Sequence, residues 1–358
     1  MFTVSLCMIV KDEEAVLARC LESVGDAADE IVIADTGSSD ATREIAARYT
    51  DKVFHFPWTG NFSEARNFSF SKATMDFILW LDADDVLSEG DRAALIRMKQ
   101  EPSDHFDVVM MPYHTAFDED GKPIFSYYRE RLIRKSIPFA WEGCVHEVIV
   151  HAGRTIYADI GVKHLSVKKS YSDRNLKIYE AQMEKGSPMS PRDRFYYGRE
   201  LYYHKKYPEA KEVLKEFLAS GQGWIENNIE ACKILSYCHK ETGDPAAAME
   251  ALTSSFRHDV PRAETCCEIA ALWMEQKNYQ AAIFWYQLAL ELPRQDTGGA
   301  FVHEDCYGFL PAIQLCVCYD RLGDLEKAKA YNRMAGSHRP HAPAYLQNLT
   351  YFERLSET

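Results

Sequence analysis

The stretch FILWLDADD (residues 77–85) indicates the fold of the first half of the chain. It begins with an apolar run, as in a strand that is covered on both faces, and it ends in a cluster of aspartates. Similar strand-like runs precede it at residues 4–10, 30–34 and 52–56, and segments with apolar residues at helical spacing separate them. This alternation predicts a mostly parallel α/β sheet with helices on both faces.

Aspartates follow the ends of two of these strands. Asp35 ends the run at residues 30–34, and Asp82 and Asp84 follow the run that ends at Leu81. Because the carboxyl ends of parallel strands meet at one edge of a sheet, we expect these side chains to lie close together. Converging carboxylates repel one another unless a cation or a donor-rich ligand satisfies them.

A hard divalent cation is the natural ligand for such carboxylates, because it keeps positions open for phosphate oxygens. It would stabilise the negative charge of a departing diphosphate, so Asp82 and Asp84 predict a site for a metal and a nucleotide diphosphate. Asp35 could accept a hydrogen bond from the N3–H of a uracil ring. Alternatively, it caps the turn at residues 37–40.

Between residues 107 and 164 the pattern changes to short strand-like runs separated by hairpin signals such as Glu119-Asp120-Gly121. These runs predict a smaller mixed or antiparallel extension of the sheet, and we expect a helix at residues 172–185 to pack across it. The segment GSPMSP then suggests a boundary. The expected domains are therefore residues 1–185 and 193–358, with a linker at 186–192.

The second half of the chain is helical and contains a degenerate repeat. Four similar segments align on Ala210, Ala248, Ala282 and Ala328, and the middle pair is 34 residues apart, which is the tetratricopeptide period. The longer last interval predicts an inserted loop around residues 293–308. Arrays of helical hairpins present an extended surface, so the repeats are expected to bind an acceptor or to form a homodimer.

Composition and charge exclude several other classes of protein. The formal net charge is −13 and the pI is about 5.4, so a nucleic-acid-binding surface or a broad basic patch for anionic lipid is not expected. No apolar run reaches the ~18 residues of a transmembrane helix, and the start of the chain lacks the basic region and the cleavage site of a signal peptide. These features predict a soluble, cytoplasmic protein.

Four ordered segments resemble the nucleotide-binding motifs of family 2 glycosyltransferases of the GT-A fold: SLCMIVKDEEAVLARCLESV, DEIVIADTGSSDAT, FSEARNFSF and FILWLDADD. A later pair, RLIRKSIPFAWEGCVHEVI and GVKHL, is similar to a branch that carries C-terminal tetratricopeptide repeats. That branch includes peptide glycosyltransferases that modify bacteriocin precursors, and relatives of the lipopolysaccharide-core glucosyltransferases. The resemblance covers roughly residues 3–185.

The resemblance implies a set of residues that bind the nucleotide. Val10, Asp12 and Glu13 would line it, with Asp35 at the base. The family usually has asparagine where this chain has Asp12, so the hydrogen-bonding role of that position differs here.

Further roles follow from the same resemblance. Arg66 and Asn67 would contact the nucleotide or the sugar, and Asp82 and Asp84 would serve the ribose and the metal. The remaining metal ligand would be a histidine after the mixed region, for which His164 is the candidate.

Inverting transfer also needs a general base that deprotonates the acceptor as it attacks. The candidates are Glu142, His146 and Glu147. If residues 145–150 form a strand, alternation puts His146 and Glu147 on opposite faces. Trp141, just before them, could stack on a sugar.

We therefore interpret the chain as an inverting glycosyltransferase that depends on Mn²⁺ or Mg²⁺. It would move a hexose from a nucleotide sugar, UDP-glucose or a similar donor, to a peptide side chain or a saccharide. The first strand is not followed by GxGxxG or by a glycine-rich basic loop, which disfavours a dinucleotide oxidoreductase and a nucleotidyltransferase. The alternative is a catalytically inactive GT-A domain on a tetratricopeptide scaffold that binds proteins.

Overall fold

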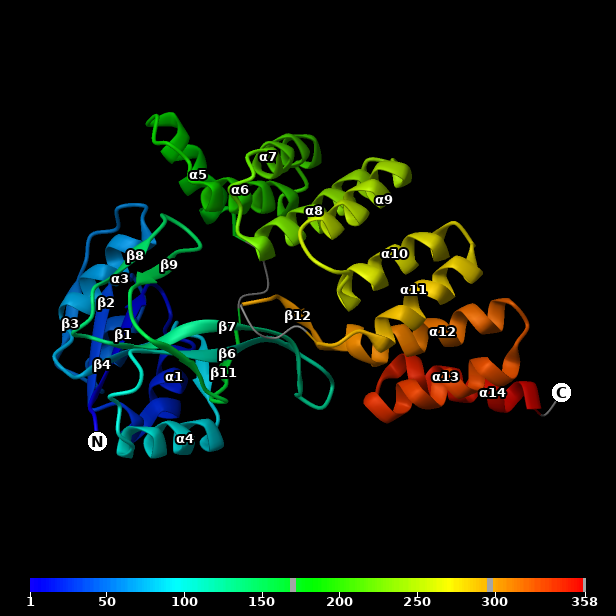
Figure 1. Cartoon of the computed structure of the whole chain (residues 1–358). Helices are drawn as coiled ribbons and strands as arrows, with labels where there is room; N and C mark the ends of the chain where they lie inside the picture. Colours follow the sequence, from blue (N-terminus) through cyan, green and yellow to red (C-terminus); the bar gives the residue numbers. More distant parts are fainter. Residues whose placement is uncertain (168–171, 295–298, 357–358) are drawn as a thin grey trace. The chain divides into compact units, whose positions relative to one another are not determined.

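The computed structural model describes residues 1–167, 172–294 and 299–356. The chain divides into two compact units (Figure 1). The first comprises residues 1–115 and 127–189, and the second comprises residues 116–126 and 190–358. The predicted order of an α/β domain followed by helical hairpins is confirmed.

The first unit alternates strands and helices and then adds shorter strands. Its elements in chain order are β1 (Val4–Val10), α1 (Leu17–Val24), β2 (Glu30–Asp35), α2 (Thr42–Ala46), β3 (Val53–His55), α3 (Phe62–Ser71), β4 (Phe77–Trp80), β5 (Asp85–Leu87), α4 (Glu89–Gln100), β6 (Val108–Phe117), β7 (Pro123–Arg134), β8 (Phe139–Glu142), β9 (Val148–His151), β10 (Thr155–Tyr157), β11 (Val162–His164) and α5 (Arg174–Glu184).

The main sheet has the strand order β3-β2-β1-β4-β7-β6-β11-β5. Strands β3, β2, β1 and β4 are parallel, so their carboxyl ends share one edge. Strand β7 pairs with β4 in the antiparallel sense, and β5 pairs with β11 in the same way. The mixed extension that the sequence predicts is therefore present.

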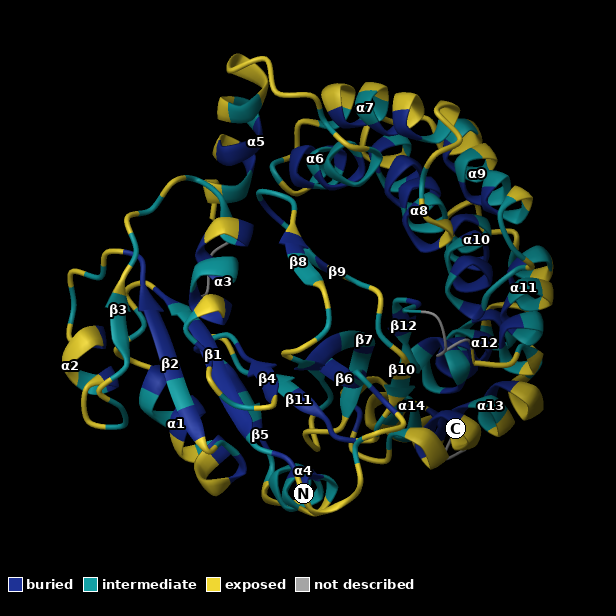
Figure 2. Ribbon diagram, turned by 60° about the vertical axis from the view of Figure 1, so that its left-hand side comes forward, coloured by how far each residue is buried: buried dark blue, intermediate teal, exposed yellow. Residues whose placement is uncertain are grey.

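Each face of this sheet carries its own hydrophobic core. On one face, side chains of β1 such as Leu6 and Met8 pack against Leu17 and Leu21 of α1. On the other face, Cys7 and Trp80 pack with Phe70 of α3 and with Trp141 of the β8–β9 hairpin. Figure 2 shows β1 and β2 as mostly buried, as their apolar sequences predict.

Some local features differ from the sequence predictions. The helix that was expected to run from residue 172 to 185 spans Arg174–Glu184. The strand predicted at residues 145–150 begins only at Val148, because residues 143–147 form a turn. Strand β5 was not predicted, because its three residues are too few to show a periodic pattern.

The second unit consists mainly of helices. Its elements are α6 (Pro191–Tyr203), α7 (Tyr207–Ala219), α8 (Ile225–Glu241), α9 (Pro245–Ser254), α10 (Ala263–Glu275), α11 (Tyr279–Glu291), β12 (Val302–His303), α12 (Phe309–Arg321), α13 (Leu325–His338) and α14 (Pro343–Ser356). Helix α6 begins inside the segment that the sequence suggested as linker, with Ser190 as its N-cap.

The four aligned alanines have the packing role that their spacing predicts. Ala210, Ala248, Ala282 and Ala328 lie in α7, α9, α11 and α13, and each is fully buried. A methyl group at these positions lets the two helices of a hairpin approach closely. Of the insertion predicted around residues 293–308, residues 295–298 lie outside the described residues, and the rest includes β12.

The tip of the β6–β7 hairpin, residues 116–126, belongs to the second unit. Val302 of β12 pairs with Ser126 in the antiparallel sense. Arg339 forms ion pairs with Glu119 and with Asp305, the latter at 2.6 Å. The sequence contains no periodic signal for these contacts, and the Arg339–Glu119 pair joins residues 220 positions apart.

Within the described residues, none of the helices combines the length and the apolar character that a bilayer crossing requires.

Glu30 supplies a test of the first unit. Burial opposes ionisation of this carboxyl group, but hydrogen bonds from Lys52, Ser5 and Thr74 outweigh burial and lower its pKa from 4.5 to about 2. We expect Glu30→Gln to reduce the free energy of unfolding by about 2–3 kcal/mol at pH 7. Since the folded-state pKa is depressed, the difference from wild type is full above pH 4.5 and fades as the pH falls through about 2.

Urea titrations at several pH values measure this difference. The matched control is Asp51→Asn at an exposed position. A variant that unfolds like wild type at pH 7 would show that the Glu30 contacts contribute nothing to stability.

Ala248 supplies a test of the repeats. Ala248→Leu forces three extra carbons into a closed helix pair and should cost about 1–3 kcal/mol. Ala246→Leu, on the exposed side of the same helix, should change the stability by less than about 0.5 kcal/mol. Thermal unfolding of both variants measures the contrast, and equal melting temperatures would contradict the assigned packing.

Candidate active site

The turn between β4 and β5 gathers the aspartates at the carboxyl edge of the sheet. The backbone N–H of Asp82 donates to Asp85 Oδ2 (3.0 Å), and the backbone N–H of Asp85 donates to the carbonyl of Asp82 (3.0 Å). This closed turn fixes the directions of the side chains. Asp85 is completely buried, whereas the side chains of Asp84 and Asp82 are 18% and 36% exposed.

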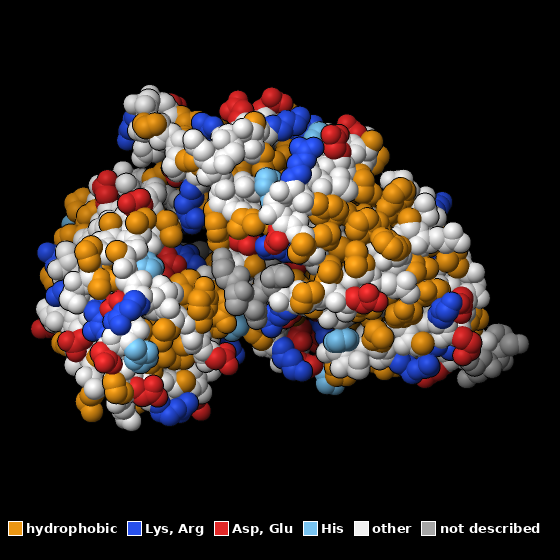
Figure 3. Space-filling model, viewed as in Figure 1, with side chains coloured by type: hydrophobic (Ala, Val, Ile, Leu, Met, Phe, Trp, Pro, Cys, Tyr) orange, Lys and Arg blue, Asp and Glu red, His pale blue; other side chains and the backbone are white. Residues whose placement is uncertain are grey.

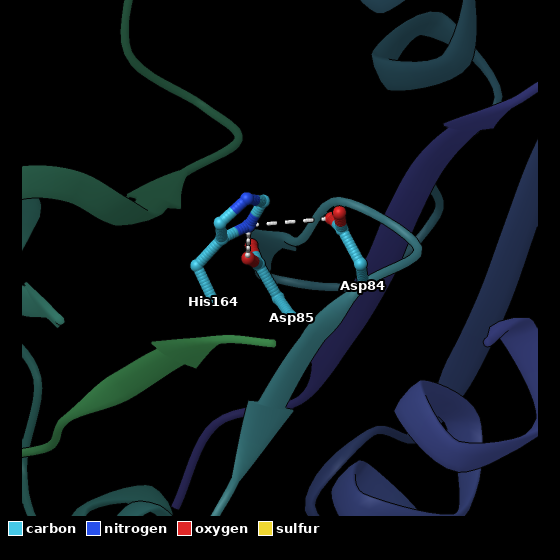
Figure 4. Close-up of side chains that lie close together, drawn as sticks. All are labelled: Asp84, Asp85 and His164. Carbon is cyan, nitrogen blue, oxygen red and sulfur yellow. Dashed lines mark hydrogen bonds and ion pairs between the residues drawn. The ribbon is translucent and has the colours of Figure 1, made fainter. Parts of the chain in front are cut away.

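His164 reaches this turn through the register of the sheet. Strand β11 pairs with β5 so that His164 lies directly opposite Asp85. The imidazole Nδ1 is 3.3 Å from Asp84 Oδ1, 3.3 Å from Asp85 Oδ1 and 2.9 Å from the hydroxyl of Tyr113 (Figure 4). Partial burial disfavours the imidazolium, but hydrogen bonds to the two aspartates outweigh it and raise the pKa of His164 to about 10.

This donor set fits a divalent cation. One ligand atom from each of Asp84, Asp85 and His164 lies within 4.8 Å of the others. Carboxylate oxygens suit Mg²⁺ and Mn²⁺, and an imidazole nitrogen is a common ligand of divalent metals in proteins. The structure thus brings together Asp84 and His164, as the sequence predicted. The sequence pattern indicated a cluster of aspartates but predicted no separate role for Asp85, because nothing in the pattern marks residue 85 as the start of a strand.

Arg66 lies beside the aspartate turn on α3. Its guanidinium forms ion pairs with Asp82 (2.8 Å) and with Glu147, and it stacks over the rings of Trp80 and Trp141 at 4.7 and 4.9 Å. Desolvation opposes ionisation of Asp82, but the positive charges of Arg66 and Arg131 outweigh it and lower the pKa of Asp82. Arg66 therefore neutralises two carboxylates at once.

Asn67, the next residue, contacts the backbone of β8. Its amide donates to the carbonyl of Trp141 (3.0 Å) and accepts from the N–H of the same residue (2.9 Å). The ring of Trp141 is 2% exposed and packs against Trp80 and Phe70, so the expectation that it stacks on a sugar is wrong. The predicted contact of Asn67 with a nucleotide or sugar stays a prediction.

The residues predicted to bind the nucleotide lie around one loop at the ends of the first two strands. Val10 and Asp35 are direct partners at the ends of β1 and β2. Asp35 accepts from the backbone N–H groups of Gly37 and Ser38 at 3.2 Å, so it caps this turn.

The Lys11–Glu14 segment faces the same loop. Asp12 adopts a positive φ of 53° and accepts from the N–H of Ser39 (2.7 Å), a bond that lowers its pKa. The N–H of Glu13 donates to the hydroxyl of Thr42 (2.7 Å).

The three candidate bases differ in their surroundings. Glu142 is exposed at the end of β8, and Glu147 is buried against Arg66. His146 is half-buried with a positive φ of 52°, inside a turn. The strand alternation that we used to separate His146 from Glu147 is therefore wrong, because this turn is held to the start of α3 by the Cys144 and Gly143 carbonyls instead of by a ladder.

Comparisons with known proteins agree with this geometry. Residues 5–151 match the model of Glycosyl transferase family 2, and residues 263–296 match that of a tetratricopeptide repeat. The chain thus carries a family 2 glycosyltransferase domain followed by tetratricopeptide-type hairpins.

Three relatives illustrate the match. The SPbeta prophage-derived glycosyltransferase SunS of Bacillus subtilis is 28% identical over 227 residues, which cover 60% of this chain and 53% of SunS. A TPR repeat-containing protein of Synechococcus elongatus is 52% identical over 87 residues, 24% of this chain and 22% of that protein. An uncharacterized glycosyltransferase of Rickettsia typhi is 37% identical over 86 residues, 24% of this chain and 29% of the relative. The matches span about half of these relatives' length or less.

Arg66 supplies the test of this site. Arg66→Met leaves Glu147 buried without its cation and should cost about 3–5 kcal/mol of unfolding free energy. Adding Glu147→Gln to that variant should recover part of the loss, because the unpaired charge is then removed. The exposed Arg48→Met is the control. Urea denaturation of wild type, Arg66→Met, Glu147→Gln, the double variant and the control measures the effect. Losses of the two single variants that add in the double variant would show that Arg66 and Glu147 do not interact.

Proposed function

We propose that this protein is a glycosyltransferase that moves a hexosyl group from a nucleotide sugar to an acceptor, with the help of a divalent cation and with inversion at the anomeric carbon. The observation that carries the proposal is the convergence of Asp84, Asp85 and His164 at the carboxyl edge of the sheet in a family 2 domain.

The chemistry follows from the charges at this edge. Cleavage of the donor leaves a nucleoside diphosphate, and a bound Mn²⁺ or Mg²⁺ supplies the positive charge that stabilises it. Asp84 and His164, whose side chains are both accessible, would hold the cation. Asp82 is fixed by Arg66 on one side and would accept a hydrogen bond from the ribose.

Asp35 supports uridine as the base of the donor. A carboxylate has about four acceptor positions, and backbone N–H groups of Gly37 and Ser38 make three contacts with Asp35. The remaining position would suit the N3–H of uracil, which would reach it after the cover over Asp35 moves, because this residue is 1% exposed. Among the uridine donors we favour UDP-glucose.

The general base would be one of Glu142, His146 and Glu147. Glu147 is joined to Asp82 through Arg66, whose guanidinium pairs with both carboxylates. Glu142 and His146 are the more accessible of the three.

The helical unit supports a role in acceptor binding or self-association. Hydrophobic side chains gather over the region of α9–α11 on the face shown in Figure 3. Two large apolar side chains of this unit, Val260 and Phe284, are 63% and 61% exposed. Surfaces of this kind favour protein contacts, so we propose a peptide as the acceptor, with a saccharide acceptor and a homodimer as the other outcomes of binding assays.

Asp84→Asn should lower the turnover of UDP-glucose by about 100-fold or more while the fold is retained, because the variant loses a negative charge that would hold the cation. Each tenfold loss corresponds to about 1.4 kcal/mol of transition-state stabilisation. His164→Ala should lower turnover less, since a neutral imidazole adds no negative charge. Release of UDP with and without Mn²⁺ measures both.

The control is Asp104→Asn, whose side chain is 91% exposed. Turnover of wild type that needs no divalent cation would refute the metal assignment. If folded wild type neither binds nor cleaves any nucleotide sugar in a panel, the domain is the inactive scaffold instead.

A further inference from the structure

Asp85 has no acceptor position left for a metal. Its Oδ1 accepts from the hydroxyl of Tyr113 at 2.9 Å and lies 3.3 Å from His164 Nδ1. Its Oδ2 accepts from the backbone N–H of Asp82 at 3.0 Å and pairs with Arg131 Nη1 at 3.1 Å. These four contacts match the roughly four lone-pair positions of a carboxylate, and the side chain is completely buried.

Arg131 fixes the position of this carboxylate. The guanidinium is fully buried, lies 3.9 Å from the ring of Trp80 and 4.4 Å from that of Tyr113, and also donates to the carbonyl of Trp80 at 3.1 Å. A planar cation between two aromatic rings is confined in direction. The direction of the Arg131 donor is therefore fixed, and this donor holds the Asp85 carboxylate in place.

The direction of the hydrogen bonds then settles the state of His164 Nδ1. Tyr113 has one hydroxyl proton, and the acceptor-only Asp85 takes it. The oxygen of Tyr113 is left as an acceptor at 2.9 Å from Nδ1. In this arrangement Nδ1 carries a proton, and Nε2 takes no part in the contacts drawn in Figure 4.

We propose that Arg131, Asp85 and Tyr113 are positioning residues that keep the proton of His164 on Nδ1 and so present Nε2 to the divalent cation. Asp85 is then not a ligand, although it belongs to the group of three residues that could hold an ion. The inference deepens the proposed function, because it concerns the same metal site. Carboxylates and other acceptors that hold a ligand histidine in this way tune metal affinity in proteins.

The competing arrangement puts the cation at Nδ1, in contact with both aspartates. The cation would have to displace the Tyr113 hydroxyl, which is the nearest neighbour of Nδ1. The hydrogen bond that Tyr113 donates to Asp85 would then be lost. The two arrangements differ in which imidazole nitrogen carries the proton when metal is bound.

Titration of Mn²⁺, followed by the loss of the free-ion electron paramagnetic resonance signal, provides the first test. Tyr113→Phe retains the ring and removes only the hydroxyl, and we expect about 10- to 100-fold weaker binding. The control is Tyr127→Phe, whose ring packs edge-on to Tyr113 at 5.5 Å and should bind within about threefold of wild type. Thermal unfolding of each variant establishes that it is folded.

The second test reads the nitrogen atoms directly. Long-range ¹H–¹⁵N correlation spectra of the protein saturated with Zn²⁺, a diamagnetic ion that imidazole nitrogen binds well, with His164 assigned from a His164→Gln spectrum, should show the proton on Nδ1. A proton on Nε2, or equal Mn²⁺ affinity of Tyr113→Phe and wild type, would overturn the proposal.

These outcomes are separable from those of the proposed function. Sugar transfer is not measured in either experiment, so the positioning role can fail while transfer stands. A wild-type protein that binds neither ion would overturn both the metal assignment and the positioning role, whereas UDP release would still report on transfer without metal.

Discussion

The rest of the site depends on the repulsion among three aspartates in one four-residue turn. Asp82, Asp84 and Asp85 end a buried strand, where water cannot screen them well. A different positively charged side chain offsets the charge of each aspartate: Arg66 that of Asp82, Arg131 that of Asp85, and His164 that of Asp84. Of these three positive groups only His164 is partly exposed, so Asp84 and His164 are the pair that a metal could reach without displacing an arginine.

Sheet topology brings these groups together. Arg131 enters through the antiparallel strand β7 next to β4, Tyr113 through β6, and His164 through the pairing of β11 with β5. The two tryptophans that flank Arg66 come from β4 and β8 and belong to the core of one sheet face. Fold stability and site electrostatics therefore share the same side chains, and changes in Arg66 or Arg131 are expected to affect both.

The sequence predicted what periodicity and strand ends can reveal. The parallel strands and the four buried repeat alanines were predictable from local patterns, whereas the pairing of Asp84 with His164 was implied by the resemblance to family 2 glycosyltransferases. The roles of Asp85, Arg131 and Tyr113 were not, because they depend on which residues face one another across strands up to 79 positions apart. The turn at residues 143–147 was mistaken for a strand, since its carbonyls bond to α3 and not to a neighbouring strand. No local sequence pattern predicts that residues 116–126 group with the helical unit either.

The central claim is that Asp84 and His164 hold a divalent cation at the carboxyl edge of a nucleotide-sugar domain. The most direct test is anomalous X-ray diffraction at the manganese edge from crystals of the full chain grown with Mn²⁺ and UDP. One strong peak in contact with Asp84, His164 Nε2 and the diphosphate is the predicted result. A peak bound to Asp85 or at His164 Nδ1, or a bound UDP with no manganese beside it, would contradict the account.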